Sequence, residues 1–150
     1  MNTFNENLTF EQKNKDMFNK IYRKLGFDII SRIDNKFYDA KLRYKTYIFT
    51  VEEKARREVW DDICVEILQD TNTNSAGWID YSKADFLIYG MFGEQIYIYR
   101  LPLKDFRSWF KQNEDRFESK ISKKGWGITE NKIVPIKDIP TNLIKLIYQK

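Results

Sequence analysis

Histidine is absent from this sequence of 150 residues, and Cys64 is its only cysteine. The lack of histidine excludes histidine-dependent catalytic triads, histidine general bases and the usual zinc sites made of cysteine and histidine. A single cysteine cannot form a disulfide within the chain, and Cys64 lies in an apolar stretch where a packed thiol is expected. Catalysis would therefore have to use carboxylates, lysine, tyrosine, serine or a metal ion that prefers oxygen ligands.

Long apolar segments are missing as well. No run approaches the ~20 apolar residues that a membrane-spanning helix needs. The first residues, MNTFNENLTFEQ, lack the basic region and apolar core of a secretory signal. We therefore expect a cytoplasmic protein without membrane contact. The sequence also shows no internal repeat, glycine-rich phosphate loop or low-complexity tract.

What the sequence does contain is enough apolar material for a core. Hydrophobic residues make up 42% and aromatic residues 16% of the chain, which excludes a disordered protein. At this length we expect one domain over residues 1–150, with residues 1–8 as a flexible lead-in. The formal net charge of +4 is compatible with a nucleic-acid partner.

Hydrophobic spacing predicts an α+β fold with a mixed or antiparallel central sheet of about five or six strands, flanked by helices. Thr9 and Gln12 fit a capping box, so a helix is expected over Thr9–Leu25, ended by Gly26. Strands are expected over residues 27–33, 37–44, 46–54, 63–68, 85–92 and 95–101, with an edge strand over 132–136. Further helices are expected over residues 103–118 and from Thr141 onward. We expect residues 37–44, 46–54 and 63–68 to be neighbouring strands of one sheet.

Each of these three expected strands contains an acidic residue. Because side chains alternate between the faces of a strand, Glu52 and Lys54 should share one face and Glu53 the other, unless a β-bulge shifts the alternation. Glu66 is the lone acid in a strand that is apolar on both faces. A buried carboxylate costs several kcal/mol unless a cation or hydrogen bonds compensate it. If Asp39, Glu52 and Glu66 gather at one sheet edge, Mg²⁺ is the natural partner. Alternatively, these acids face solvent and Glu52 and Lys54 form a simple ion pair.

Asp39 followed by Glu52-x-Lys54 resembles the core motif of the PD-(D/E)XK nuclease superfamily. The order of elements is also similar: a helix, a β-meander that carries the acids, and a further strand. Gly77-Trp78 and Ala84-Asp85-Phe86 resemble small phage and bacterial members of that superfamily. The resemblance covers roughly residues 9–101 and implies a restriction-endonuclease-like fold. Asp34 and Asp28 remain alternatives to Asp39 as the first acid of the motif.

The resemblance implies a nuclease that hydrolyses phosphodiester bonds, in DNA, with Mg²⁺ or Mn²⁺. Asp39, Glu52 and Glu66 would hold the metal, and Lys54 would act on the attacking water or on the transition-state charge. Glu66 could instead orient Lys54. The residues expected to contact the substrate are Lys41, Arg43, Arg56, Arg57, Trp78 and Lys83. The structural alternatives are that the charged side chains of the loop only face solvent and that Trp78 packs at the end of the sheet.

A second hypothesis comes from a different class of protein. The same fold could be a non-catalytic nucleic-acid-binding or protein-interaction module of a phage or mobile element. In that case Glu52 and Lys54 are only an ion pair. The sequence leaves open whether the protein acts as a monomer or as a homodimer.

Overall fold

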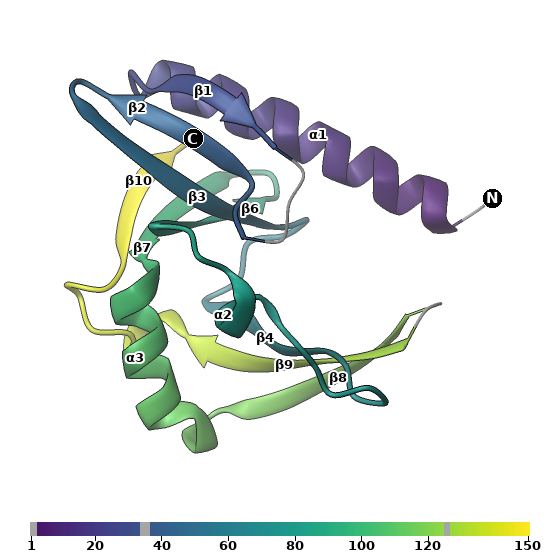
Figure 1. Ribbon diagram of the computed structural model, residues 1–150. Coiled ribbons are helices and arrows are strands. Elements are labelled where there is room, and N and C mark those ends of the chain that lie inside the picture. The colour runs from purple at the N-terminus through teal and green to yellow at the C-terminus, as the bar shows by residue number, and fades with distance from the viewer. Residues whose placement is uncertain (1–2, 34–36, 125–126) are drawn as a thin grey trace.

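The computed structural model describes residues 3–33, 37–124 and 127–150, with side chains for residues 10–33, 37–123 and 127–150. That part of the chain forms three α-helices and two β-sheets (Figure 1). The helices are α1 (Thr3–Lys24), α2 (Trp78–Tyr81) and α3 (Leu103–Asn113), and 3-10 turns span Glu114–Arg116 and Ile136–Asp138. The strands are β1 (Asp28–Arg32), β2 (Ala40–Tyr44), β3 (Tyr47–Arg56), β4 (Asp62–Asp70), β5 (Ser75–Ala76), β6 (Phe86–Phe92), β7 (Ile96–Pro102), β8 (Glu118–Lys124), β9 (Gly127–Pro135) and β10 (Lys145–Gln149).

The larger sheet has six strands in the order β1-β2-β3-β6-β7-β10. Strands β3 and β6 pair in parallel, and the other neighbours pair antiparallel. A parallel pair needs a long crossover connection. Here the crossover contains β4, β5 and α2, which therefore sit beside the strands they connect. The prediction of an α+β fold with a mixed sheet of five or six strands and flanking helices is confirmed.

The smaller sheet has four antiparallel strands in the order β5-β4-β9-β8. The prediction that residues 63–68 adjoin the two preceding strands in one sheet is therefore wrong. Residues 62–70 do form a strand, β4, but the place beside β3 belongs to β6, where Val51 faces Phe86. The apolar side chains of Ile63 and Val65 are buried because β4 packs on the larger sheet and the helices instead.

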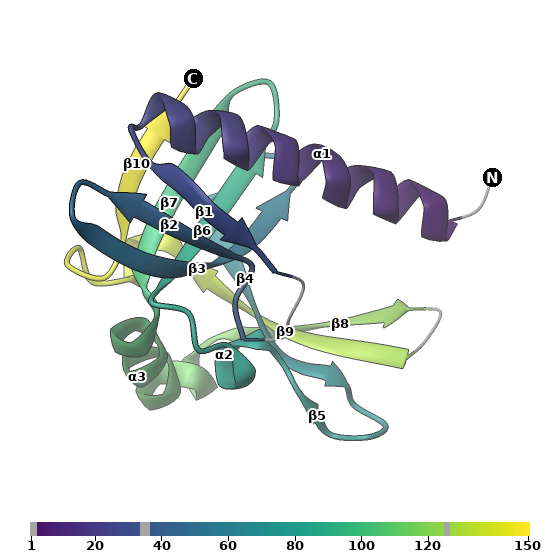
Figure 2. The ribbon, with the colours of Figure 1, turned by 45° about the horizontal axis from the view of Figure 1, so that its top comes forward.

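Helix α1 covers one face of the six-stranded sheet, which we call the α1 face (Figures 1 and 2). Phe18, Ile21 and Tyr22 are buried there against strand residues that include Val51. Gly26 ends the helical segment as predicted, with a positive φ of 85° that glycine adopts readily. The helix begins at Thr3, so the capping box at Thr9 is wrong, and residues 3–8 are helical rather than a flexible lead-in.

The other face of the six-stranded sheet, which we call the inner face, packs against the four-stranded sheet, α2 and α3 (Figure 1). Leu87 and Tyr89 of β6 are buried there with Ile63 of β4 and Phe106 of α3. The sheet is thus sandwiched between α1 on one side and a mixed layer on the other. The predicted strands over 27–33, 85–92 and 95–101 are confirmed, and the helix expected over 103–118 is present as α3 but ends at Asn113.

Two predictions about the C-terminal region are wrong. The helix expected from Thr141 is instead the strand β10, which pairs with β7 and covers its otherwise open edge. The strand expected over 132–136 is β9, and it lies between β4 and β8 rather than at an edge. Pro135 is tolerated because it is the last residue of that strand, opposite Asp62, so few ladder bonds need its missing N–H.

No helix in the described part of the chain is long and apolar enough to span a membrane.

Candidate active site

Alternation along β3 separates Glu52 and Lys54 from Glu53, as predicted. The register with β6 runs without interruption from Val51 to Arg56, so no bulge disturbs the period of two. Val51 packs against α1, and Glu53 therefore lies on the α1 face with it. Glu52 and Lys54 lie on the inner face, towards the four-stranded sheet.

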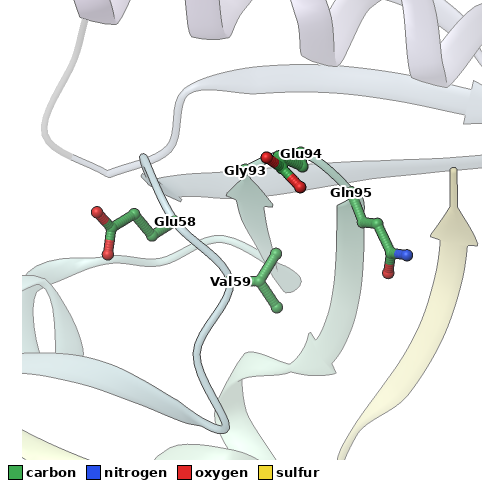
Figure 3. A pocket seen from close by; sticks show the side chains of 5 residues that line it. All are labelled: Glu58, Val59, Gly93, Glu94 and Gln95. Atoms are coloured by element: carbon green, nitrogen blue, oxygen red, sulfur yellow. The ribbon is translucent and has the colours of Figure 1, made fainter.

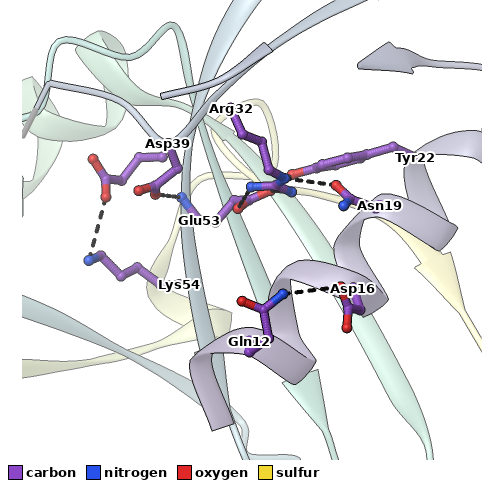
Figure 4. Close-up of polar contacts among 9 residues, drawn as sticks. Gln12, Asp16, Asn19, Tyr22, Arg32, Asp39, Glu53 and Lys54 are labelled. Carbon is purple, nitrogen blue, oxygen red and sulfur yellow. Dashed lines mark hydrogen bonds and ion pairs between the residues drawn. The ribbon is translucent and has the colours of Figure 1, made fainter. Parts of the chain in front are cut away.

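Glu53 belongs to a structural network between β3, β1 and α1 (Figure 4). Its carboxylate accepts two hydrogen bonds from Arg32, at 2.7 and 2.9 Å, and one from the hydroxyl of Tyr22. Asn19 of α1 accepts a further bond from Arg32 at 2.8 Å. The Glu53 side chain is only 6% exposed, so this fully paired arrangement is what makes its burial tolerable.

Glu52 is the buried acid of the inner face, at 4% exposure. Lys54 Nζ lies 3.5 Å from its carboxylate, and Ser82 and Asp39 lie beside it. Burial raises the pKa of Glu52 to about 7, and the neighbouring Asp39 carboxylate adds to the rise, while Lys54 and Ser82 oppose it. The single ammonium of Lys54 therefore does not fully compensate this pair of carboxylates.

Asp39 lies immediately before β2 and is held at the edge of β3. Its backbone N–H donates to the carbonyl of Val51 at 2.8 Å, and its carboxylate accepts from the backbone N–H of Glu53 at 2.6 Å (Figure 4). Asp39 precedes the first residue of β2, so its side chain, instead of a backbone carbonyl of a paired strand, accepts the hydrogen bond from the Glu53 N–H. This places its carboxylate next to Glu52.

Lys54 lies among several acidic groups. Burial, the largest single influence, lowers the pKa of Lys54, but the negative charges of Glu52, Tyr81, Asp39 and Glu66 together exceed it, so the pKa of Lys54 is raised. Lys54 therefore stays an ammonium at neutral pH. Its Nζ also lies 6.0 Å from the centroid of the Trp78 ring. Because Glu66 also contributes to the raised pKa, it lies near Lys54.

The short helix α2 brings Tyr81 and Ser82 to these residues. Gly77 precedes it, and its N–H donates to the carbonyl of Ile67 in β4 at 2.9 Å. A Cβ at Gly77 would lie 2.1 Å from the carbonyl oxygen of Glu66, so only glycine allows this approach. Burial raises the pKa of Tyr81, as do Glu52, Glu66 and Asp39 against the opposing Lys54, so its hydroxyl keeps its proton.

Arg107 of α3 anchors this segment from outside the site. Its guanidinium donates hydrogen bonds to the backbone carbonyls of Ile79 and Ser82. Lys111, one turn further along α3, forms an ion pair of 2.8 Å with Asp80. The position of Ser82 beside Glu52 is thus fixed from α3.

The grouping of acids fits a small divalent cation only in part. Within the described residues, no three histidine, cysteine, aspartate or glutamate side chains are close enough together to hold a metal ion. The structure therefore does not bring Asp39, Glu52 and Glu66 together as three ligands. Asp39 and Glu52 alone do fit Mg²⁺ or Mn²⁺, because such ions are commonly held by one or two carboxylates, with waters and substrate phosphates completing the shell.

The pairing of β1 with β2 distinguishes Asp28 from Asp39 as the first acid of the motif. Asp28 lies opposite Arg43, towards the hairpin end of β2, and forms an exposed ion pair of 3.0 Å with it. Asp39, at the beginning of β2, is the one beside Glu52. Asp34 and the turn expected over residues 34–36 lie outside the described residues.

The residues expected to contact substrate divide into two groups. Arg56 is bound to Asp62 at 2.7 Å, Arg57 stacks 4.3 Å from the Phe10 ring centroid, and Arg43 pairs with Asp28, so these three are already engaged. Trp78 is only 2% exposed, so its expected stacking on bases is wrong and its alternative as a packed aromatic holds.

Lys41 and Lys83 form the second group, and neither has a salt bridge within the described residues. Lys41 lies opposite Thr50, on the same face of the hairpin as Glu52. Lys83 is exposed, and its Nζ lies 4.6 Å from the ring centroid of Phe37. Both amines flank the segment that carries Asp39.

A pocket of about 300 Å³ lies elsewhere, between the loop after β3 and the β6–β7 turn (Figure 3). It is lined by Glu58, Val59, Gly93, Glu94 and Gln95. With two carboxylates and no cation in its lining, it does not suit a polyanion.

The candidate site residues expected from the sequence did not include Tyr81, Ser82 or Arg107. No local pattern marks Ser82 or Arg107, because their roles arise from the contact between α2, α3 and β3. Only Gly77 offers a sequence signal, because a glycine before an aromatic residue can mark a place where two backbones approach closely, as α2 approaches β4 here.

Comparison with known proteins gives no match: no family model, no curated protein and no solved structure is significantly similar to this chain.

Proposed function

We propose that the protein is a divalent-metal-dependent nuclease that hydrolyses phosphodiester bonds, with DNA as its substrate. The observation that carries this proposal is the cluster of Asp39, Glu52 and Lys54 on the inner face. Two neighbouring carboxylates, one buried with a pKa raised to about 7, are accompanied by one ammonium. Groups with shifted pKa values, here Glu52 and Lys54, are typical of functional sites.

Asp39 and Glu52 would hold the ion, because their carboxylates adjoin and their charge exceeds what Lys54 compensates. A divalent cation bound there supplies Lewis-acid stabilisation of the phosphate charge and makes an attacking water more acidic. Its two positive charges would also remove the cost of ionising Glu52 next to Asp39.

Lys54 would stabilise negative charge on the phosphate. Its raised pKa argues against a role as general base, since a base must be unprotonated to accept a proton. In the reaction, water attacks phosphorus, the bond to one ester oxygen breaks, and that oxygen leaves with a proton. Tyr81, which keeps its hydroxyl proton, would donate a hydrogen bond to the same phosphate.

The structural alternative, that Glu52 and Lys54 are only an ion pair, does not explain why the carboxylate of Asp39 lies beside Glu52. A structural ion pair is more stable when one cation meets one anion, as on the opposite side of β3, where Arg32 is bound to Glu53. A second carboxylate beside Glu52 raises the cost of the charged state and so needs a functional explanation.

The test is cleavage of plasmid, duplex and single-stranded DNA, and of RNA, by purified protein with Mg²⁺, Mn²⁺ or EDTA. Cleavage with a metal and none with EDTA is expected, together with a rise in melting temperature when either ion is added. Asp39→Asn should lose both the cleavage and the metal-induced rise. If the wild-type protein cleaves no nucleic acid and neither ion shifts its melting temperature, a non-catalytic binding module replaces the nuclease.

A further inference from the structure

A row of residues crosses the four-stranded sheet from the candidate active site to β8. Glu66 of β4 lies opposite Asn131 of β9, and Asn131 lies opposite Lys120 of β8. Neighbouring strands are ~4.8 Å apart, so the row carries Lys120 to ~10 Å from Glu66, measured between backbones. Because Glu66 neighbours Lys54, this row extends the site in one direction.

The face of the sheet that carries this row differs from its other face. On the other face, Val65 and Val134 are buried in the core, and Lys132 donates to the carbonyl of Phe117 at 3.2 Å. On the face with Glu66, the side chains of Asn131 and Lys120 are polar, half-buried and exposed respectively. An antiparallel sheet commonly packs on one face and meets solvent on the other.

Electrostatics connect Lys120 with the end of β3. Burial raises the pKa of the Cys64 thiol, and both Arg56 and Lys120 counteract that rise, so both cations lie near it. Arg56 is already bound to Asp62, whereas Lys120 forms no salt bridge within the described residues. Lys120 is therefore a cation without a salt bridge in the described residues, near Cys64, which lies two residues before Glu66 on the same face of β4.

We propose that this face, which we call the Lys120 face, binds the backbone of the nucleic acid, with Lys120 contacting a phosphate beyond the one cleaved at Lys54. The inference rests on the proposed nuclease function. The substrate would run from Lys41 and Lys83, past Asp39 and Lys54, to Lys120. A strand that enters the site must leave it again, and each phosphate held by a lysine releases counterions.

The strand β8 supplies a matched control. Lys120 and Lys123 are both exposed, but they are three residues apart in an uninterrupted ladder and so point to opposite faces of the sheet. Lys120→Ala and Lys123→Ala remove the same charge from the same strand. Glu118 shares the Lys120 face two residues earlier, so Glu118→Gln removes a repulsive charge there.

The experiment measures binding of labelled duplex and single-stranded DNA by fluorescence anisotropy over a range of salt concentrations, in Ca²⁺ to prevent cleavage. Lys120→Ala should weaken binding several-fold and reduce the slope of log affinity against log salt by about 0.7 to 0.9, the value for one phosphate contact. Lys123→Ala should match the wild type, and Glu118→Gln should bind more tightly. Melting temperatures of all variants should agree, since these side chains are exposed.

The outcomes separate this proposal from the proposed nuclease function. If the wild type cleaves DNA but Lys120→Ala and Lys123→Ala have equal effects, the Lys120 face is not a binding surface and the nuclease remains. If the wild type binds DNA through Lys120 without cleaving it, the Lys120 face is supported and the nuclease is not. If it neither binds nor cleaves, both proposals fail.

Discussion

The carboxylate of Asp39 accepts a 2.6 Å hydrogen bond from the backbone N–H of Glu53, whose own side chain lies on the opposite face of β3. Arg32 holds the Glu53 side chain in place, and the Glu53 peptide in turn holds Asp39. The two faces of β3 therefore have separate tasks that share one backbone position. One face attaches the sheet to α1, and the other forms the candidate site.

The first prediction compares the two adjacent acids. Glu52→Gln should lower the rate of metal-dependent cleavage by a factor of about 10² to 10³, as expected for loss of one positioned charged group. Glu53→Gln should keep cleavage but lower the free energy of unfolding by about 1.5 to 3 kcal/mol, because charged hydrogen bonds to Arg32 are lost. Initial cleavage rates and urea denaturation measure the two effects. Equal loss of cleavage in both variants would contradict the assignment of separate faces.

The second prediction concerns stability and pH without metal. Below the ordinary pKa of 4.5, Glu52 is protonated in both the folded and the unfolded chain, so it does not affect stability there. Between 4.5 and about 7, the unfolded chain loses this proton first, so the folded state loses stability as the pH rises. At ~1.4 kcal/mol per pKa unit, the loss by pH 8 is on the order of 3 kcal/mol.

Glu52→Gln cannot ionise and should escape this loss. In EDTA, its melting temperature should exceed that of the wild type at pH 8, and the two should converge as the pH falls towards 4.5. Thermal denaturation across this range measures the effect. A constant difference at every pH would show that Glu52 is not the group with the raised pKa.

The third prediction concerns Lys54. Lys54→Met keeps most of the aliphatic side chain and removes the ammonium, and it should lower cleavage by a factor of about 10² to 10³. Stability should fall only modestly, because Glu52 can take up a proton once its cation is gone. Lys54 forms a partly buried ion pair with Glu52.

Lys104→Met serves as the control for Lys54, since Lys104 is exposed on α3 and away from the site in the sequence. Its cleavage rate should equal that of the wild type. Lys54→Arg keeps the charge and should retain part of the activity. Full activity in Lys54→Met would leave the nuclease proposal standing but remove Lys54 from its mechanism.

The fourth prediction concerns the approach of α2 to β4. Gly77→Ala places a Cβ 2.1 Å from the backbone oxygen of Glu66, a clash with main chain that only movement can relieve. We expect a loss of stability of about 1 to 3 kcal/mol and reduced cleavage, because Tyr81 and Ser82 move with α2. Ala76→Ser adds one atom at the exposed neighbouring position and should behave as wild type. Calorimetry and cleavage rates measure both.

The arrangement of β2 and β3 could be predicted because alternation with a period of two fixes which side chains share a face. The placement of Glu52 and Lys54 together, with Glu53 apart, followed from three consecutive letters of the sequence. Asp39 came within reach because the short connection between β2 and β3 permits only an antiparallel pair.

Other features depend on contacts that no local pattern records. The apolar run at Ile63 and Val65 predicts a buried strand, but periodicity does not say which sheet contains it. Leu146 and Ile147 suit a helix or a strand equally in so short a segment. They form a strand because β7 has an edge with which that segment pairs. Trp78 was ambiguous because its polar neighbours are exposed while the ring itself is buried.

The chain passes repeatedly between its two sheets, and this has a consequence for synthesis on the ribosome. After β3 it moves to the four-stranded sheet, returns for β6 and β7, leaves again for β8 and β9, and returns for β10. β4 gains its long partner only when β9 has emerged, since Cys64 pairs with Ile133. Neither half of a growing chain can therefore assemble the layer around Lys54. Under the proposed function, a nascent chain would therefore be inert towards nucleic acid until most of its residues have left the ribosome.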